Sequence, residues 1–215
     1  MEKVKFTLGL DFPNTPHFID GDTKLTQTVA ILRYLAGKNM TWMGKTRKQK
    51  LRISVAEQQS VDFRETLRCF VNRSDFDSAK DEFIKTTIPA MFEMWEKFLG
   101  DHRKYLAGDN ITYVDFMVYE NLDSYRLFQP KILDDFPILK AFHSRIRDLP
   151  QMQKYLNSSS YRKWPIFNAK AKFEVAERHQ NMLEFGFYFC LEKNQIALFT
   201  FLIVLFNVIV CAIFC

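Results

Sequence analysis

The stretch LGLDFPNTPHFIDGDTKLTQT, residues 8–28, decides how the first part of this 215-residue chain folds. Residues 17–19 and 24–26 are β-prone runs that flank Asp20-Gly21-Asp22. Because Asp-Gly supplies the positive φ angles that a tight hairpin turn needs, these residues predict two short antiparallel strands. Pro16 follows a short polar turn, where an X-Pro bond can be cis.

The helical pattern that follows the second strand predicts an anion site. Apolar residues recur at helical spacing from Thr28 to Ala36, with Thr28 as the expected N-cap and Lys38-Asn39 as the end. The N-terminus of a helix presents free N–H groups and a partial positive charge, so it binds carboxylates. A turn at Pro16 exposes the backbone of Thr15, and together the two features predict a clamp for a small extended peptide.

These residues, in this order and spacing, closely resemble the glutathione-binding half of a mu-class glutathione transferase. Among the arthropod and parasite-like members of that family, the run Ala56-Glu57-Gln58-Gln59 looks most like the mite proteins. The resemblance implies that Gln27 and Thr28 hold the γ-glutamyl carboxylate of glutathione. It also implies that the backbone of Thr15 pairs with the cysteinyl group. Asn14 is expected at the glycyl end, and Lys5 at the glycyl carboxylate. The alternative is an ordinary hairpin followed by a well-capped helix.

The resemblance also implies a homodimer. Phe12 corresponds to an aromatic "lock" that inserts into the partner subunit, and Arg33 to an arginine at the two-fold axis, where the interface is isologous. Asp62 matches an acidic residue that reaches the glutathione amine of the neighbouring subunit. The alternatives are a core aromatic for Phe12 and a solvated carboxylate for Asp62.

Composition excludes several classes of function. Hydrophobic residues make up 47% of the chain, 22 residues are Phe, and the net charge is +5. The basic run at residues 45–52 has no interleaved aromatics at base-stacking spacing, which disfavours nucleic-acid binding. The four cysteines form no C-x-x-C pair and the four histidines are scattered, so we expect a reducing, cytoplasmic setting and no metal. Glutathione is expected as a co-substrate, with no other cofactor.

The rest of the chain has helical periodicity and almost no strand signal. The fold class we predict is α+β overall: an incomplete thioredoxin-like domain at 1–40, an all-α transferase domain at 46–165 and a linker at 166–194. Resemblance in the helical part is carried by Ile53–Gln59, Phe98–Gly100 and Leu133–Pro137. The expected helices are Lys50–Val71, Phe76–Leu99, Tyr113–Phe128, Ile138–Arg147 and Pro150–Leu156.

One helix start follows from residue chemistry alone. Thr112 is the expected N-cap of the helix at 113–128, and Asp115 stands three residues later, so the two form a capping box. Ile111 and Phe116 occupy the positions of a hydrophobic staple. The role of Thr112 and Asp115 is structural, and the family that this chain resembles has the same capping box at this place.

Three features set this chain apart from the family pattern, and the third is its hydrophobic C-terminal tail. The β-α-β unit that supplies the thiolate-stabilising tyrosine is absent, and thiolate formation matters because a free thiol has a pKa of about 8.5. Phe70 stands where the family has a tyrosine near the electrophile pocket. We therefore expect a transferase that conjugates glutathione to hydrophobic electrophiles in detoxification, with impaired activity. The alternative is a non-catalytic paralogue that binds glutathione or apolar ligands, dimerises, or is anchored to a membrane.

The hydrophobic tail at 195–215 is the third departure. Residues 196–215 carry no charge and are nearly all Leu, Ile, Val, Phe and Ala, which is long enough to span a bilayer. One hypothesis is a tail anchor with the rest of the chain facing the cytosol. The other is that non-coding sequence has been translated into the chain, so that the tail is an artefact of the gene model.

Overall fold

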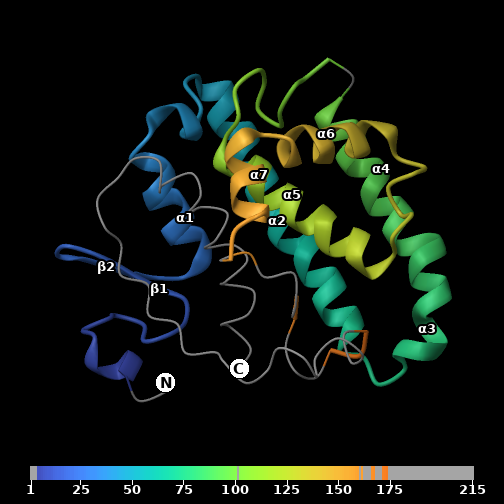
Figure 1. Ribbon diagram of the computed structural model, residues 1–215, viewed down its shortest axis with the longest axis horizontal. Coiled ribbons are helices and arrows are strands. Elements are labelled where there is room, and N and C mark those ends of the chain that lie inside the picture. Colours follow the sequence, from blue (N-terminus) through green and yellow to red (C-terminus); the bar gives the residue numbers. More distant parts are fainter. Residues whose placement is uncertain (1–3, 101, 160, 162–165, 168–170, 174–215) are drawn as a thin grey trace.

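The computed structural model describes residues 4–100, 102–159, 161, 166–167 and 171–173. A small hairpin and one helix precede a bundle of longer helices (Figure 1). The hairpin strands β1 (His17–Asp20) and β2 (Thr23–Thr26) are antiparallel, and His17 lies opposite Thr26. The remaining elements of this part are the 3-10 helix η1 (Val4–Thr7), α1 (Thr28–Gly37) and the 3-10 helix η2 (Met40–Met43).

The start of α1 corrects one expectation. Gln27, rather than Thr28, occupies the N-cap position, and no side chain caps the helix. Gln27 has φ 70°, the only positive φ at a non-glycine residue in the described part of the chain. The chain therefore leaves β2 through a left-handed residue, and Thr28 is already inside the helix, where it cannot act as N-cap.

The helical part contains the helices that the sequence predicts, with two differences. Its elements are α2 (Arg47–Val71), α3 (Phe76–Glu82), η3 (Phe83–Thr87), α4 (Ile88–Leu99), α5 (Tyr113–Phe128), α6 (Pro137–Arg147) and α7 (Pro150–Leu156). First, α2 begins three residues early because Thr46 and Gln49 form a capping box: the Gln49 N–H donates to Thr46 Oγ1 at 3.1 Å, and Gln49 Oε1 accepts from the Thr46 N–H at 3.0 Å.

Second, the single helix expected over Phe76–Leu99 contains a π-helical turn, η3, between α3 and α4. Pro89 provides the physical reason, because it has no N–H to donate back to the preceding turn. The Ile88 N–H bonds to Phe83 O instead, five residues back, which widens the helix locally.

Aromatic rings dominate the core of the helical bundle. Phe63 stacks on Tyr125 with ring centroids 4.6 Å apart, and Phe92 and Trp95 contact Phe63 edge-on or tilted. A second cluster contains Phe70, whose ring lies 3.8 Å from that of Phe83 in a parallel stack. The high Phe content of the sequence is thus used largely to fill the bundle.

Residues 174–215, which include the hydrophobic tail, lie outside the described residues, as does most of the expected linker. Within the part that the structure describes, no helix is both long enough and apolar enough to cross a bilayer. The hairpin region also exposes several apolar side chains: Phe6, Phe12 and Ile19 are 65%, 72% and 41% exposed.

Candidate functional site

The hairpin brings the two expected halves of the peptide clamp to one end. Because His17 pairs with Thr26, the residues before β1 and after β2 are neighbours across the same end of the sheet. Pro16 therefore faces Gln27, and the Thr15–Pro16 bond is cis. The register thus places the Pro16 turn beside the start of α1.

The N-terminus of α1 keeps its backbone donors available. The first hydrogen bond back to Gln27 comes from the Ile31 N–H at 3.0 Å. The N–H groups of Thr28, Val29 and Ala30 consequently have no partner inside the helix. No side chain caps them, so this end of α1 presents a group of donors and a partial positive charge to an anion.

The segment before β1 contains the other residues expected to contact the peptide, but it does not bring all of them together. Asn14 Oδ1 accepts the Thr15 N–H at 2.9 Å, so a peptide that pairs with Thr15 has to displace this side chain. Lys5 lies in η1 with its ammonium 5.3 Å from the Phe6 ring centroid. Among the described residues, no hydrogen bond or ion pair joins Lys5 to the clamp.

A buried carboxylate, Glu57, fixes α1 to the helical bundle. Arg33 of α1 donates Nε–H to Glu57 Oε2 at 2.7 Å and pairs with Oε1 through its other nitrogen. The Tyr113 hydroxyl of α5 also donates to Glu57, which is fully buried on α2. The hydrogen bond to Glu57 raises the pKa of Arg33, and burial raises that of Tyr113. Arg33 is expected at a dimer axis, and its side chain is 51% exposed.

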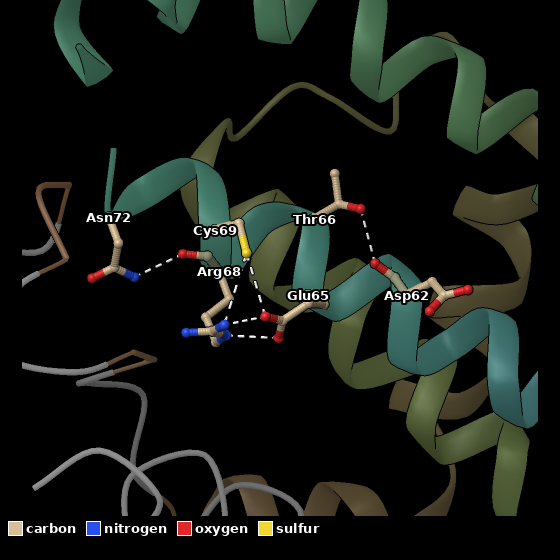
Figure 2. A network of polar contacts seen from close by, with 6 residues as sticks. All are labelled: Asp62, Glu65, Thr66, Arg68, Cys69 and Asn72. Atoms are coloured by element: carbon tan, nitrogen blue, oxygen red, sulfur yellow. Dashed lines mark hydrogen bonds and ion pairs between the residues drawn. The ribbon is translucent and has the colours of Figure 1, made fainter. Parts of the chain in front are cut away.

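Asp62 lies on an exposed stretch of α2 whose polar side chains are shown in Figure 2. Its backbone carbonyl accepts from Thr66 Oγ1 at 2.8 Å, and its carboxylate points away from the Glu65–Arg68 ion pair. Cys69 donates to Glu65 Oε1 at 3.3 Å, and burial raises the pKa of its thiol. Asp62 thus remains an exposed, unpaired carboxylate within the described residues, and its role toward a partner subunit stays a prediction.

Phe70 does not have the environment expected of a substrate contact. It is 3% exposed and its ring is enclosed by those of Phe76, Phe83 and Phe128. Its place near the end of α2 turns the ring into the bundle rather than toward an open surface. Phe70 is therefore a core residue of the helical part. In this arrangement its ring contacts other core rings and does not line an open pocket.

The Thr112–Asp115 pair forms a capping box at the start of α5. Asp115 Oδ2 accepts the Thr112 N–H and hydroxyl, both at 2.7 Å, and Oδ1 accepts the Leu106 N–H at 2.8 Å. The carboxyl is fully buried, so it ties the 102–112 loop to α5 from inside the protein. A catalytic role would need access that this burial denies.

Burial raises the pKa of Asp115 from 3.8 to about 6, although its donors act in the opposite direction. Between these pH values the folded chain keeps a proton that the unfolded chain has released. The contribution of this carboxyl to stability is therefore complete below pH 3.8 and falls as the pH rises through about 6. We expect the stability difference between wild type and Asp115→Ala to be larger at pH 5 than at neutral pH. Urea unfolding of both proteins at the two pH values measures it, and equal differences would contradict it.

Two charged residues of α2 that have buried polar atoms escaped the sequence analysis. Glu57 is one; the other is Arg64, whose Nη2 is buried without a hydrogen-bond partner among the described residues, and burial lowers its pKa. The charge of Glu120 acts in the opposite direction. Charged residues on a helix usually face solvent, so the sequence alone offered no signal for either.

Comparisons with known proteins agree with this fold. A family model described as "Glutathione S-transferase, C-terminal domain" matches residues 61–159. The chain is 44% identical to the class-mu 26 kDa isozyme 7 glutathione S-transferase of Fasciola hepatica, and 45% identical to glutathione S-transferase Mu 1 of Rattus norvegicus. Each match covers 79% of this chain and 76% of the relative. The solved structure of the glutathione S-transferase Blo t 8 superposes with a TM-score of 0.70 at 32% identity, covering 79% of this chain and 80% of the other.

The small N-terminal sheet and the helical C-terminal part therefore define a glutathione S-transferase fold. Identity at this level over three quarters of the relatives' length shows the class as well. The chain belongs to the mu-class glutathione S-transferases.

Proposed function

We propose that this chain binds glutathione with the end of the hairpin and α1, as part of a reaction that joins the glutathione sulfur to a hydrophobic electrophile. Detoxification in the cytosol is the setting that goes with this reaction. The observation that carries the proposal is the uncapped N-terminus of α1, which the hairpin register brings beside the Thr15–Pro16 turn. A helix end without a capping side chain suits the γ-glutamyl carboxylate.

Removing the Thr28 hydroxyl tests the carboxylate contact. We expect Thr28→Val to weaken glutathione binding about tenfold, because a hydrogen bond to a charged group contributes roughly 1.5–3 kcal/mol. Valine keeps the shape of the side chain, so α1 should remain folded. Calorimetric titration of the full chain with glutathione measures the change.

The matched control is Thr86→Val, which removes an exposed hydroxyl from η3 far along the sequence from the clamp. This variant should bind glutathione like wild type. Equal affinities for wild type and Thr28→Val would contradict the proposed contact. An absence of any glutathione binding by the folded wild-type chain would overturn the proposal as a whole.

The impaired turnover expected from the sequence is part of the proposal. The first tyrosine, Tyr34, donates its hydroxyl to Asp20 Oδ2 at 3.0 Å, so it serves the packing of α1 on the hairpin. This arrangement gives it no part in stabilising a thiolate at the clamp. Conjugation of a chloronitrobenzene by the chain is therefore expected to be slow even where glutathione binds.

A homodimer completes the proposed site. Phe12 projects from its loop with 72% of its surface exposed, as an aromatic that inserts into a second subunit would. The exposure of Asp62 supports a contact of its carboxylate outside its own subunit. The half-exposed side chain of Arg33 supports a contact with a symmetry mate.

A further inference from the structure

A hollow of about 240 Å³ lies between the C-terminal end of α4 and one face of α6, and neither the clamp nor the core uses it. Figure 1 shows these two helices side by side, away from the hairpin. Two arginines, Arg103 and Arg145, line the hollow, together with an apolar wall formed by Leu99, Pro137, Ile138 and Ala141. We call it the α4–α6 hollow.

Main-chain carbonyls hold both arginines in place. Arg103 donates Nε–H to Leu99 O at 2.8 Å and Nη2–H to Phe98 O at 2.9 Å, at the end of α4. Arg145 donates Nη1–H to Lys104 O at 2.8 Å. A third arginine, Arg52, also donates to Phe98 O, at 2.7 Å. The guanidinium groups are therefore positioned before any ligand arrives.

The cluster carries uncompensated positive charge. No carboxylate pairs with these three arginines in the part of the chain that the structure describes. Carboxylates do pair with four others: Arg33, Arg68, Arg73 and Arg126. Glu96, near the hollow, accepts the N–H groups of Ile138 and Leu139 at 2.8 and 3.2 Å at the start of α6, and it forms no ion pair with these arginines among the described residues. Burial, then repulsion from Arg103, lowers the pKa of Arg52.

Several donors remain for a ligand. A guanidinium has five N–H groups, of which Arg103 uses two and Arg145 one in the bonds described above. A planar group of this kind matches the oxygen spacing of phosphate and sulfate. The apolar wall lowers the local dielectric constant and strengthens the attraction. The volume is below the roughly 300–1,000 Å³ of sites for drug-sized ligands, so it suits a small one.

We propose that the α4–α6 hollow is a binding site for a small tetrahedral oxyanion, carried as the free ion or as the ester of a small apolar alcohol. Arg103 and Arg145 bind the oxygens, and the wall formed by Leu99, Ile138 and Ala141 contacts the apolar group. The site is independent of glutathione binding at α1.

Calorimetric titration of the full chain with inorganic phosphate, sulfate and phenyl phosphate tests this proposal. We expect saturable binding with one site, phenyl phosphate several-fold tighter than inorganic phosphate because of the apolar wall. The comparison of phenyl phosphate with inorganic phosphate distinguishes the ester from the free ion, and sulfate shows whether a second tetrahedral oxyanion is accepted. Repeating the titration with saturating glutathione should leave the affinity unchanged, which separates this site from the anion site at α1.

Three variants locate the binding. Arg145→Gln should weaken phosphate binding about tenfold or more, since it removes a charged donor. Arg147→Gln, two residues along the same helix and exposed, removes the same charge and should change affinity less than about twofold. Ala141→Glu, at an exposed helix position, places a carboxylate over the hollow with both arginines intact and should abolish binding of inorganic phosphate. Ala141→Gln adds no charge and should still bind inorganic phosphate, although it alters the wall and should weaken phenyl phosphate binding.

Each contrary result overturns the proposal. Absence of saturable binding to all three probes would do so, and so would equal losses in Arg145→Gln and Arg147→Gln, which would indicate diffuse charge attraction. Competition by glutathione would assign the binding to α1 instead. Circular dichroism verifies that each variant is folded. If Arg145→Gln does not fold, the comparison of Ala141→Glu with Ala141→Gln still tests the proposal.

Discussion

Asp115→Ala is expected to lower the free energy of unfolding by about 3 kcal/mol at neutral pH, because it leaves three buried donors without an acceptor. These donors are the Leu106 N–H, the Thr112 N–H and the Thr112 hydroxyl. The substitution also releases the 102–112 loop from α5, so part of the loss comes from the helix start itself. Urea unfolding followed by circular dichroism gives the value.

Asp109→Ala is the matched control, because Asp109 is an exposed aspartate of the same loop. It should change stability by no more than about 0.5 kcal/mol, as surface substitutions usually do. Thr112→Ser keeps the hydroxyl and should cost much less than Asp115→Ala. If Asp115→Ala and Asp109→Ala were equally stable, the buried hydrogen bonds of Asp115 would make no net contribution to the free energy of unfolding. The capping box would then not stabilise the protein.

Local signals explain why much of the fold could be predicted. The helix at 113–128 begins at its predicted residue because the Thr112–Asp115 capping box defines its N-terminus. The hairpin follows from Asp20-Gly21, and α7 from the proline at its first position. In each case the signal acts over a few residues, so no knowledge of the packing is needed.

Features that depend on packing were missed. The carboxylate of Glu57 is buried by partners 24 and 56 residues away, so its surroundings do not show in the neighbouring sequence. Phe70 reads equally well as a pocket residue or a core residue until the rings of Phe76 and Phe83 are placed around it. Arg103 and Arg145 are 42 residues apart in a chain rich in surface arginines, and only the fold brings them to one hollow.

The second large effect is expected at Glu57, which joins three helices. Glu57→Ala removes the acceptor of Arg33 in α1 and of Tyr113 in α5, and it leaves the buried Tyr113 hydroxyl unpaired. We expect a loss of about 3 kcal/mol, at the lower end of the range for breaking a buried ion pair because Arg33 is half exposed. Urea unfolding measures the loss.

Glutathione affinity should fall in the same variant, because α1 carries the clamp and Arg33 fixes α1 to α2. Glu65→Ala provides the control: Glu65 also pairs with an arginine on α2, but its side chain is 49% exposed, so we expect a change of at most about 1 kcal/mol and no change in affinity. A double-mutant cycle of Glu57→Ala with Tyr113→Phe should give a coupling energy of about 1–2 kcal/mol. If Glu57→Ala unfolded at a higher urea concentration than Glu65→Ala, hydrophobic contacts alone would hold α1 in place. Glutathione affinity would then be independent of the Glu57 hydrogen bonds.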